Sequence, residues 1–135
     1  MNQTWRVLIV DDEASHRAGL AGMVTAWGMM ADTASDGVEA LQKLAQIPVD
    51  VILTDLKMPR MDGFDLLEKL RGMDHSPPAI VVTAYGSVDS VIRTVHELGA
   101  FWFVEKPVQA STLEALVLRA ASQIDNLPSC SQRIQ

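Results

Sequence analysis

The chain has a single cysteine and no long hydrophobic segment. Cys130 has no second cysteine with which to form an internal disulfide, so we expect the protein to fold in a reducing compartment. No apolar run approaches the ~20 residues that a membrane-spanning helix needs. The apolar stretch Trp5–Val10 is also too short for the core of a signal peptide. We therefore predict a soluble, cytoplasmic protein with no membrane partner.

Basic residues are in the minority, with 11 Lys and Arg against 17 Asp and Glu, and the formal net charge is −6. A negative surface repels a phosphate backbone, so direct nucleic-acid binding is not expected. His16, His75 and His96 are scattered and unmatched by cysteine, which disfavours a zinc site. We expect His16 and His96 to lie on solvated helix faces. The acidic balance does suit a site that collects Mg²⁺.

The composition fits one globular domain. Apolar residues make up 48% of the 135 residues, too many for a disordered chain. A chain of this length buries roughly 65–70% of its unfolded surface and needs no disulfide or structural metal. We assign residues 1–125 to one folded domain. The polar segment Asn126–Gln135, which contains Pro128, is interpreted as a tail or linker.

Short apolar runs rich in β-branched residues alternate with amphipathic segments along the chain. The runs predict five strands, at Val7–Val10, Met30–Ala34, Val49–Thr54, Ala79–Thr83 and Phe101–Val104. The amphipathic segments predict five helices, at Glu13–Trp27, from an Asp36 N-cap to Ala45, from the Asp62-Gly63 turn to Arg71, from a Ser87 N-cap to Leu98, and at Ala110–Ile124. Five βα units with short connections imply an α/β fold with a parallel sheet and helices on both faces.

The fourth of these helices has a stripe that we expect to face the core: Val88, Val91, Ile92, Val95 and Leu98. Its β-branched and small polar residues have weak helix propensity, so the helix depends on packing and can shift at modest cost. Gly99 is expected to end this helix, as Gly28 ends the first. Phe101, Trp102 and Phe103 are consecutive on the fifth predicted strand, so their side chains must point to opposite faces of the sheet. Either helices cover some of them, or they help to form a surface for a partner.

Polar residues stand at the ends of four predicted strands. Asp11-Asp12-Glu13 follows the first, Asp55 the third, Thr83-Ala84 ends the fourth, and Lys106-Pro107 follows the fifth. Taken alone, each of these has an ordinary structural explanation. Asp11-Asp12 could cap the first helix, Asp55 and Lys106-Pro107 could be turn residues, and Thr83 could hydrogen-bond a free backbone group. Because parallel strands end at one edge of the sheet, these residues should lie close together. Such a set arises rarely by chance.

Three carboxylates in one pocket require a counter-charge. Two carboxylates about 4 Å apart repel by roughly 4 kcal/mol at an effective dielectric near 20. Oxygen ligands with no His or Cys nearby favour Mg²⁺, or Mn²⁺ as a substitute. A carboxylate can also accept a phosphoryl group as an acyl phosphate. Mg²⁺, the Lys106 ammonium and the Thr83-Ala84 segment would then neutralise or bind the phosphoryl oxygens.

These residues resemble the receiver signature of two-component response regulators. The resemblance is carried by Val10-Asp11-Asp12-Glu13, Asp55-Leu56-Lys57-Met58-Pro59 with Asp62-Gly63, Thr83-Ala84 and Lys106-Pro107, and it runs from about Trp5 to Ile124. It implies a doubly wound, five-stranded (βα)5 sheet of CheY-like or flavodoxin-like architecture, with strand order 2-1-3-4-5. It identifies residues 1–125 as the receiver domain.

The resemblance also implies a role for each site residue. Asp55 would be the phosphoacceptor. Asp12 would bind Mg²⁺ directly and Asp11 through water, with the backbone carbonyl of Lys57 as a further ligand. Thr83, Ala84 and Lys106 would hold the phosphoryl oxygens, with a cis bond between Lys106 and Pro107. Thr83 and Phe103 would form the switch, and Lys57 and Tyr85 would flank the phosphoryl site.

The segment Thr83-Ala84-Tyr85-Gly86-Ser87-Val88, with Gly99-Ala100-Phe101, is similar to NtrC-type regulators. That similarity implies a histidine kinase as phosphodonor, a phosphorylation-dependent homodimer, and output ATPase and DNA-binding domains that this chain does not contain. We therefore expect an excised receiver, and a stand-alone regulator is the alternative. The expected output is transcriptional. We expect a regulatory domain that promotes its own phosphorylation and dephosphorylation rather than an enzyme.

Three other functions fit parts of the sequence. A haloacid-dehalogenase-type phosphatase needs a second Asp two residues after the nucleophile, where this chain has Lys57, and usually a cap domain. A flavin-binding module of the same architecture needs a phosphate loop after the first strand, where Asp11-Asp12-Glu13 would repel a phosphate. A receiver that folds but is not phosphorylated is disfavoured because no site residue is missing.

Overall fold

The computed structural model describes residues 4–84, 89 and 92–125. Five parallel strands form one sheet in the order β2-β1-β3-β4-β5, which confirms the predicted fold and strand order. The strands are β1 (Arg6–Val10), β2 (Met30–Ala34), β3 (Val51–Thr54), β4 (Ala79–Thr83) and β5 (Trp102–Glu105). Their bounds differ from the predicted ones by up to two residues. The largest difference is at β3, which begins two residues later than predicted, directly after Asp50, whose backbone and side chain both hydrogen-bond Arg6.

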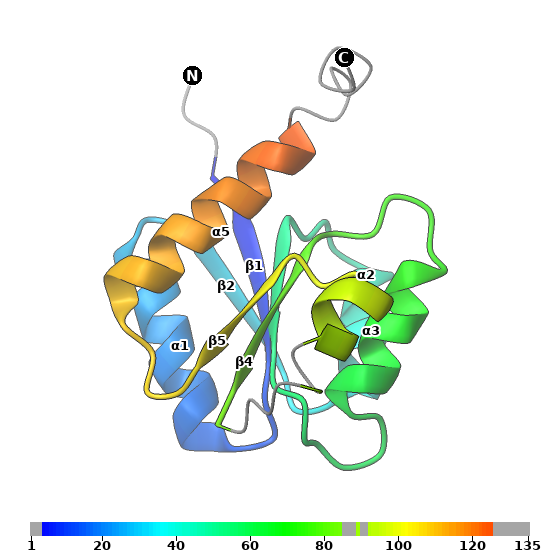
Figure 1. Ribbon diagram of the computed structural model, residues 1–135. Coiled ribbons are helices and arrows are strands. Elements are labelled where there is room, and N and C mark those ends of the chain that lie inside the picture. The colour runs from blue at the N-terminus through cyan, green and yellow to red at the C-terminus, as the bar shows by residue number, and fades with distance from the viewer. Residues whose placement is uncertain (1–3, 85–88, 90–91, 126–135) are drawn as a thin grey trace.

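Helices cover both faces of the sheet, as predicted (Figure 1). α1 (Ala14–Ala26) and α5 (Ala110–Asp125) lie on one face, and α2 (Gly37–Leu44) and α3 (Gly63–Arg71) lie on the other. A short π-helix, η1 (Arg93–Glu97), precedes β5. None of the described helices is long and apolar enough to cross a membrane.

The hydrophobic core is divided between the two faces according to the strand period of two. In β1, Val7 and Ile9 pack with α1 and α5, whereas Leu8 and Val10 pack with α2 and α3. The sheet is buried on both faces, which explains why β1, β3 and β4 are uninterrupted apolar runs. α5 is amphipathic, as predicted, and its buried side chains are Leu113, Val117, Ala120 and Ala121.

Capping fixes the start of two helices. The Asp36 carboxylate accepts the Glu39 N–H at 2.9 Å, as predicted, and Asp62 does the same for Asp65 at 2.9 Å. Gly63 is required for a different reason, namely close approach: a Cβ at this position would lie 2.2 Å from the backbone oxygen of Asp55. α3 therefore begins directly against the backbone of the predicted phosphoacceptor.

The predicted fourth helix is only partly confirmed. Ser87, Val88 and Val91, as well as the tail 126–135, lie outside the described residues. Ile92 was expected to face the core, but it is 46% exposed, while Thr94 is buried with 1% exposure and Leu98 is buried as predicted. The cause is the π-turn, in which the Leu98 N–H reaches the Arg93 carbonyl at 2.9 Å and turns a different face inward than a 3.6-residue period would.

The three aromatic residues before and within β5 do face different ways. Phe101 packs against the α1–α5 side of the core and Phe103 against the α2–α3 side. Trp102 is 49% exposed and stacks on Phe103, with ring centroids 6.1 Å apart. This strand therefore leaves a large apolar side chain at the surface.

Candidate functional site

Four strands bring the predicted site residues to one edge of the sheet. β1, β3, β4 and β5 are neighbours, and Asp11, Asp55, Thr83 and Lys106 stand at or directly after their carboxyl ends. Residues that are up to 95 positions apart in sequence thus come into contact. The two described chain ends lie at the opposite edge (Figure 1).

The carboxylates of Asp11, Asp12 and Asp55 form a cluster in which their ligand oxygens all lie within 4.8 Å of one another. Asp11 is buried with 1% exposure, Asp55 is half-buried and Asp12 is exposed. The cluster is therefore open to solvent on the Asp12 side and closed on the Asp11 side. This gradient suits a cation or a phosphoryl donor that arrives from outside.

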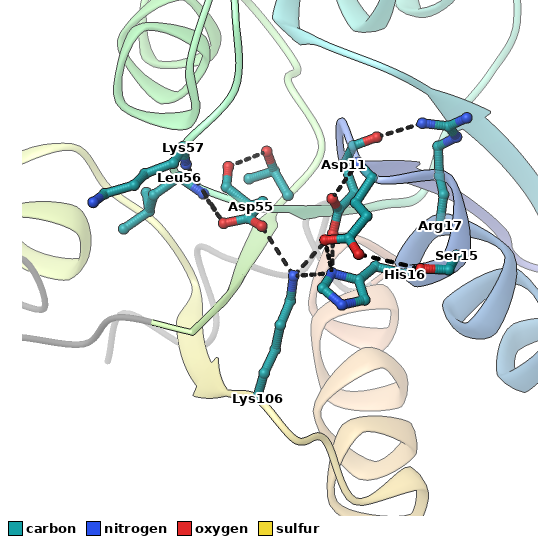
Figure 2. Close-up of polar contacts among 10 residues, drawn as sticks. Asp11, Ser15, His16, Arg17, Asp55, Leu56, Lys57 and Lys106 are labelled. Atoms are coloured by element: carbon teal, nitrogen blue, oxygen red, sulfur yellow. Dashed lines mark hydrogen bonds and ion pairs between the residues drawn. The ribbon is translucent and has the colours of Figure 1, made fainter.

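Lys106 places its ammonium between two of these carboxylates (Figure 2). Its Nζ donates to Asp55 Oδ2 at 2.9 Å and to Asp11 Oδ2 at 3.0 Å. Burial by itself lowers the pKa of Lys106, but the hydrogen bonds to Asp55 and Asp11 outweigh burial, so the pKa is raised above its ordinary value. Lys106 is thus a fixed positive charge at neutral pH. The predicted cis bond between Lys106 and Pro107 is present.

Backbone groups hold the remaining carboxylate oxygens. The Glu13 N–H donates to Asp11 Oδ1 at 2.9 Å, and the Leu56 N–H donates to Asp55 Oδ1 at 2.6 Å (Figure 2). The Arg17 guanidinium donates to the Asp11 backbone oxygen at 2.7 Å. Both aspartates are therefore oriented before any ligand binds, which reduces the entropy lost on binding.

The charges of this cluster do not balance. Three carboxylates face one ammonium among the described residues, so the site carries an excess of negative charge. The donor set is rich in carboxylate oxygen, as Mg²⁺ and Mn²⁺ prefer, and the residues present therefore fit the predicted metal. Lys57 is exposed, with its N–H 3.5 Å from Asp55 Oδ1. The role of its carbonyl as a ligand stays a prediction.

Thr83, Ala84 and Phe103 lie on the neighbouring strands. Thr83 is buried at the end of β4, Ala84 is exposed, and Phe103 is partly buried. The carbonyl of Thr83 accepts the backbone N–H of Lys106 at 2.9 Å, so the ends of β4 and β5 are tied together beside the site. The placement agrees with the predicted switch pair, whose roles no contact here tests. Tyr85 lies outside the described residues.

His16 is a site residue that sequence reasoning missed. It is on a helix face with a side chain 44% exposed, as expected, yet its Nδ1 lies 3.0 Å from Lys106 Nζ and 3.3 Å from Glu13 Oε1 (Figure 2). One signal was available, because His16 follows Asp12 by four residues and so sits in the first turn of the helix at the site.

Sequence reasoning also missed an ion pair beside the site, between Asp36 and Arg60. Arg60 Nε and an Arg60 terminal nitrogen contact Asp36 Oδ2 at 2.7 and 2.6 Å, and the Gly37 N–H donates to the Met61 carbonyl at 3.0 Å. We call these contacts the Asp36–Arg60 clamp. Arg60 has a φ of 63°, which a non-glycine residue rarely adopts. The clamp ties the β3–α3 loop, which begins next to Asp55, to the start of α2.

Comparison with known proteins identifies the family to which the chain belongs. The sequence profile of the family described as "Response regulator receiver domain" matches residues 7–118. The chain is 37% identical over 115 residues to the regulatory protein AtoC of Escherichia coli strain K12, covering 85% of this chain and 25% of that protein. It is 35% identical over 116 residues to the DNA-binding transcriptional regulator NtrC of the same strain, covering 86% and 24%.

Solved structures give the same result. A receiver domain protein from Clostridium thermocellum matches with a TM-score of 0.84 and 29% identity, over 91% of this chain and 98% of that one. The chain spans about a quarter of the length of the curated relatives named above, so their similarity to it concerns only their receiver portion. This chain belongs to the response regulator receiver domain family of two-component systems and is similar to the receivers of NtrC-type regulators.

Proposed function

We propose that the protein accepts a phosphoryl group from a histidine kinase onto Asp55, in the presence of Mg²⁺, and changes conformation in response. The observation that carries the proposal is the position of Lys106 Nζ, 2.9 Å from Asp55 Oδ2 and 3.0 Å from Asp11 Oδ2 beside the exposed Asp12. A cation and two further carboxylates around one half-buried carboxylate suit phosphoryl transfer, which is catalysed mainly by positioning and charge neutralisation.

The residues of the chain would divide the work as follows. A carboxylate oxygen of Asp55 forms the new bond to phosphorus while the bond to the donor's leaving atom breaks, and the leaving group departs with the electron pair. Lys106 donates a hydrogen bond to one phosphoryl oxygen, and the Thr83 hydroxyl, with the Ala84 backbone, donates to another. Mg²⁺, held by Asp11, Asp12, Asp55 and the Lys57 carbonyl, would supply the additional positive charge that the phosphoryl oxygens require.

The direct test is intact-mass measurement after incubation with a small acyl phosphate. Wild-type protein should gain one phosphoryl group when Mg²⁺ is present and none when it is chelated. Asp55→Asn should gain none. Asp65→Asn is the matched control, because it makes the same substitution at an exposed carboxylate on α3. This variant should gain one phosphoryl group, as wild type does. Equal labelling of Asp55→Asn and wild type would contradict the assignment of the phosphoacceptor.

The proposed output is altered self-association through the fourth helix, β5 and α5, driven by the Thr83–Phe103 pair. Support comes from exposed apolar side chains on or beside each of these elements, at Ile92, Trp102 and Leu118. A difference of about 1.4 kcal/mol between the two states would change a dimerisation constant tenfold. Sedimentation over a range of concentrations, with and without a phosphoryl mimic, should show this change. Identical association constants would direct the search to a different partner.

We further propose that residues 1–125 act as the receiver unit, and that 126–135 lead to output ATPase and DNA-binding regions in a cytoplasmic protein. The lengths of the curated relatives, about four times the matched part, support this arrangement. The gene sequence beyond the codon for Gln135 tests it. An open reading frame for those regions would support the proposal, and a stop codon would favour a stand-alone regulator.

A further inference from the structure

The ammonium of Lys106 makes three contacts, and only two of them are with carboxylates. Nζ lies 2.9 Å from Asp55 Oδ2, 3.0 Å from Asp11 Oδ2 and 3.0 Å from His16 Nδ1 (Figure 2). An ammonium group has three N–H donors, so these three acceptors satisfy it completely. His16 is thus a full member of the hydrogen-bond shell of Lys106.

The chemistry of the pair identifies the role of the ring nitrogen. Lys106 can only donate, so a hydrogen bond between the two groups requires His16 Nδ1 to accept, with the proton of a neutral imidazole on Nε2. Glu13 Oε1 also lies 3.3 Å from Nδ1, but that carboxylate is 58% exposed and can turn to water. The Lys106 contact is both shorter and better shielded, since the Lys106 side chain is only 15% exposed.

The three acceptors differ in what the proposed reaction does to them. Asp55 would become phosphorylated or bind the metal, and Asp11 would bind the metal or one of its water ligands. Both would then be weaker acceptors for Lys106. His16 is neither a proposed metal ligand nor a phosphoryl acceptor, so its nitrogen stays available throughout.

We propose that His16 is a positioning residue for Lys106: it keeps the ammonium beside the phosphoryl site when Asp55 and Asp11 become engaged. The proposal rests on the proposed function, because it concerns how Lys106 meets a phosphoryl oxygen. The long, flexible lysine side chain would otherwise gain freedom as its carboxylate partners are withdrawn. A third acceptor that stays in place keeps the Lys106 ammonium aligned with the phosphoryl oxygen.

Two substitutions at this position separate positioning from packing. His16→Leu removes the acceptor but keeps an apolar side chain in the helix. His16→Asn keeps a side-chain oxygen close to where Nδ1 lies. We expect the rate constant for phosphorylation by a small acyl phosphate to fall at least about tenfold in His16→Leu, the effect of losing one hydrogen bond to a charged group. His16→Asn should recover to within about twofold of wild type, by the same estimate.

Thr25→Ala, an exposed change at the far end of α1, is the matched control and should label at the wild-type rate. In a Lys106→Met background, His16→Leu should cause no further loss, because the residue that it positions is gone. Equal rates for His16→Leu and wild type, no better rate for His16→Asn than for His16→Leu, or full additivity with Lys106→Met would each overturn the proposal.

A second measurement does not depend on phosphorylation. Nitrogen-15 spectra of the imidazole in the unphosphorylated protein should show an unprotonated Nδ1 and a protonated Nε2, and Lys106→Met should shift the Nδ1 resonance. A protonated Nδ1, or a resonance unaffected by Lys106→Met but moved by Glu13→Gln, would overturn the contact. If wild type is not labelled on Asp55 while the ring nitrogen behaves as expected, the proposed function fails and the His16–Lys106 contact stands.

Discussion

Two buried aspartates follow neighbouring strands of this sheet, and their surroundings differ mainly in charge. Asp11 follows β1 with 1% exposure, and Asp36 lies two residues after β2 with 4% exposure. In each, Oδ1 accepts a backbone N–H at 2.9 Å and Oδ2 accepts a cationic side chain. The Arg60 guanidinium pairs with Asp36 alone among the contacts described, whereas Lys106 is shared between Asp11 and Asp55, with Asp12 nearby.

We infer that this difference separates an aspartate that stabilises the fold from one that belongs to the proposed phosphoryl site. The backbone hydrogen bond from Glu39, followed by the contacts with Arg60, holds the pKa of Asp36 below its ordinary value despite burial. Its charge is fully compensated by the protein. The Asp11–Asp12–Asp55 cluster has more carboxylates than cations, so it can gain energy from an additional cation. Asp11 and Asp36 are alike in their burial and in their hydrogen bond from a backbone N–H, so only the balance of charge distinguishes their surroundings.

The largest expected effect is on metal binding at the uncompensated cluster. Asp12→Ala removes an exposed carboxylate that is free to turn toward the metal, and we expect it to weaken Mg²⁺ binding at least about thirtyfold, or roughly 2 kcal/mol. Glu13→Ala, one residue away and also exposed, should change the affinity less than about threefold. Calorimetric titration measures both. Similar losses in the two variants would mean that the metal site has been misplaced.

At the compensated pair the expected effect is on stability. Asp36→Ala removes the cap of α2 and should lower the free energy of unfolding by about 1–2 kcal/mol. The ion pair with Arg60 adds little to this, because the Arg60 side chain is 62% exposed and its charge is screened by solvent. Asp36→Asn keeps a capping oxygen and should cost less. Urea denaturation gives both values, and Mg²⁺ affinity should stay at the wild-type level in both. A large loss of Mg²⁺ affinity in Asp36→Asn would break the distinction between the two aspartates.

The pH dependence of stability should report the same pair. Because the pKa of Asp36 is lowered on folding, its contribution is present above the unfolded value of 3.8 and is lost as the pH falls through the folded pKa. Asp36→Asn lacks this titration, so its stability should fall less steeply than that of wild type on acidification below about pH 4. Denaturation at several pH values measures this. If the free energy of unfolding falls equally steeply with pH in wild type and Asp36→Asn, the assignment is contradicted.

A smaller effect should follow when the cation of each pair is removed. Lys106→Met frees Asp11 and Asp55 oxygens from competition and should tighten Mg²⁺ binding about two- to fivefold, although the response to phosphorylation should be lost. Arg60→Met should leave the Mg²⁺ affinity unchanged. Weaker Mg²⁺ binding in Lys106→Met would show that the ammonium supports the metal site rather than competing with it.

The fold and most of the site were predictable because they depend on patterns that are local in sequence. Buried parallel strands produce uninterrupted apolar runs, and polar residues at their ends, such as Asp11, Asp55 and Lys106, meet at one edge by topology alone. The Asp36 cap was likewise visible in its spacing from the start of an amphipathic segment. These features require no knowledge of how individual side chains pack.

The features that sequence reasoning missed depend on side-chain geometry. His16 resembles any exposed helical histidine until the β5–α5 loop places Lys106 beside it. Arg60, which contacts Asp36, has a backbone φ of 63°, a conformation that its residue type does not indicate. The inward orientation expected of Ile92 assumed a 3.6-residue period, which the π-turn from Arg93 to Leu98 replaces. Contacts of this kind have no periodicity to detect.

The central claim is that uncompensated charge at Asp11, Asp12 and Asp55 makes this edge of the sheet a metal-dependent phosphoryl site. Its most direct test is Mg²⁺ titration followed by amide chemical shifts. We predict saturable binding of one Mg²⁺, with the largest shifts at residues 11–13, 55–58 and 106 and little change at Asp36 and Arg60. Shifts of equal size at the Asp36–Arg60 clamp, or no saturable binding at the cluster, would contradict the account.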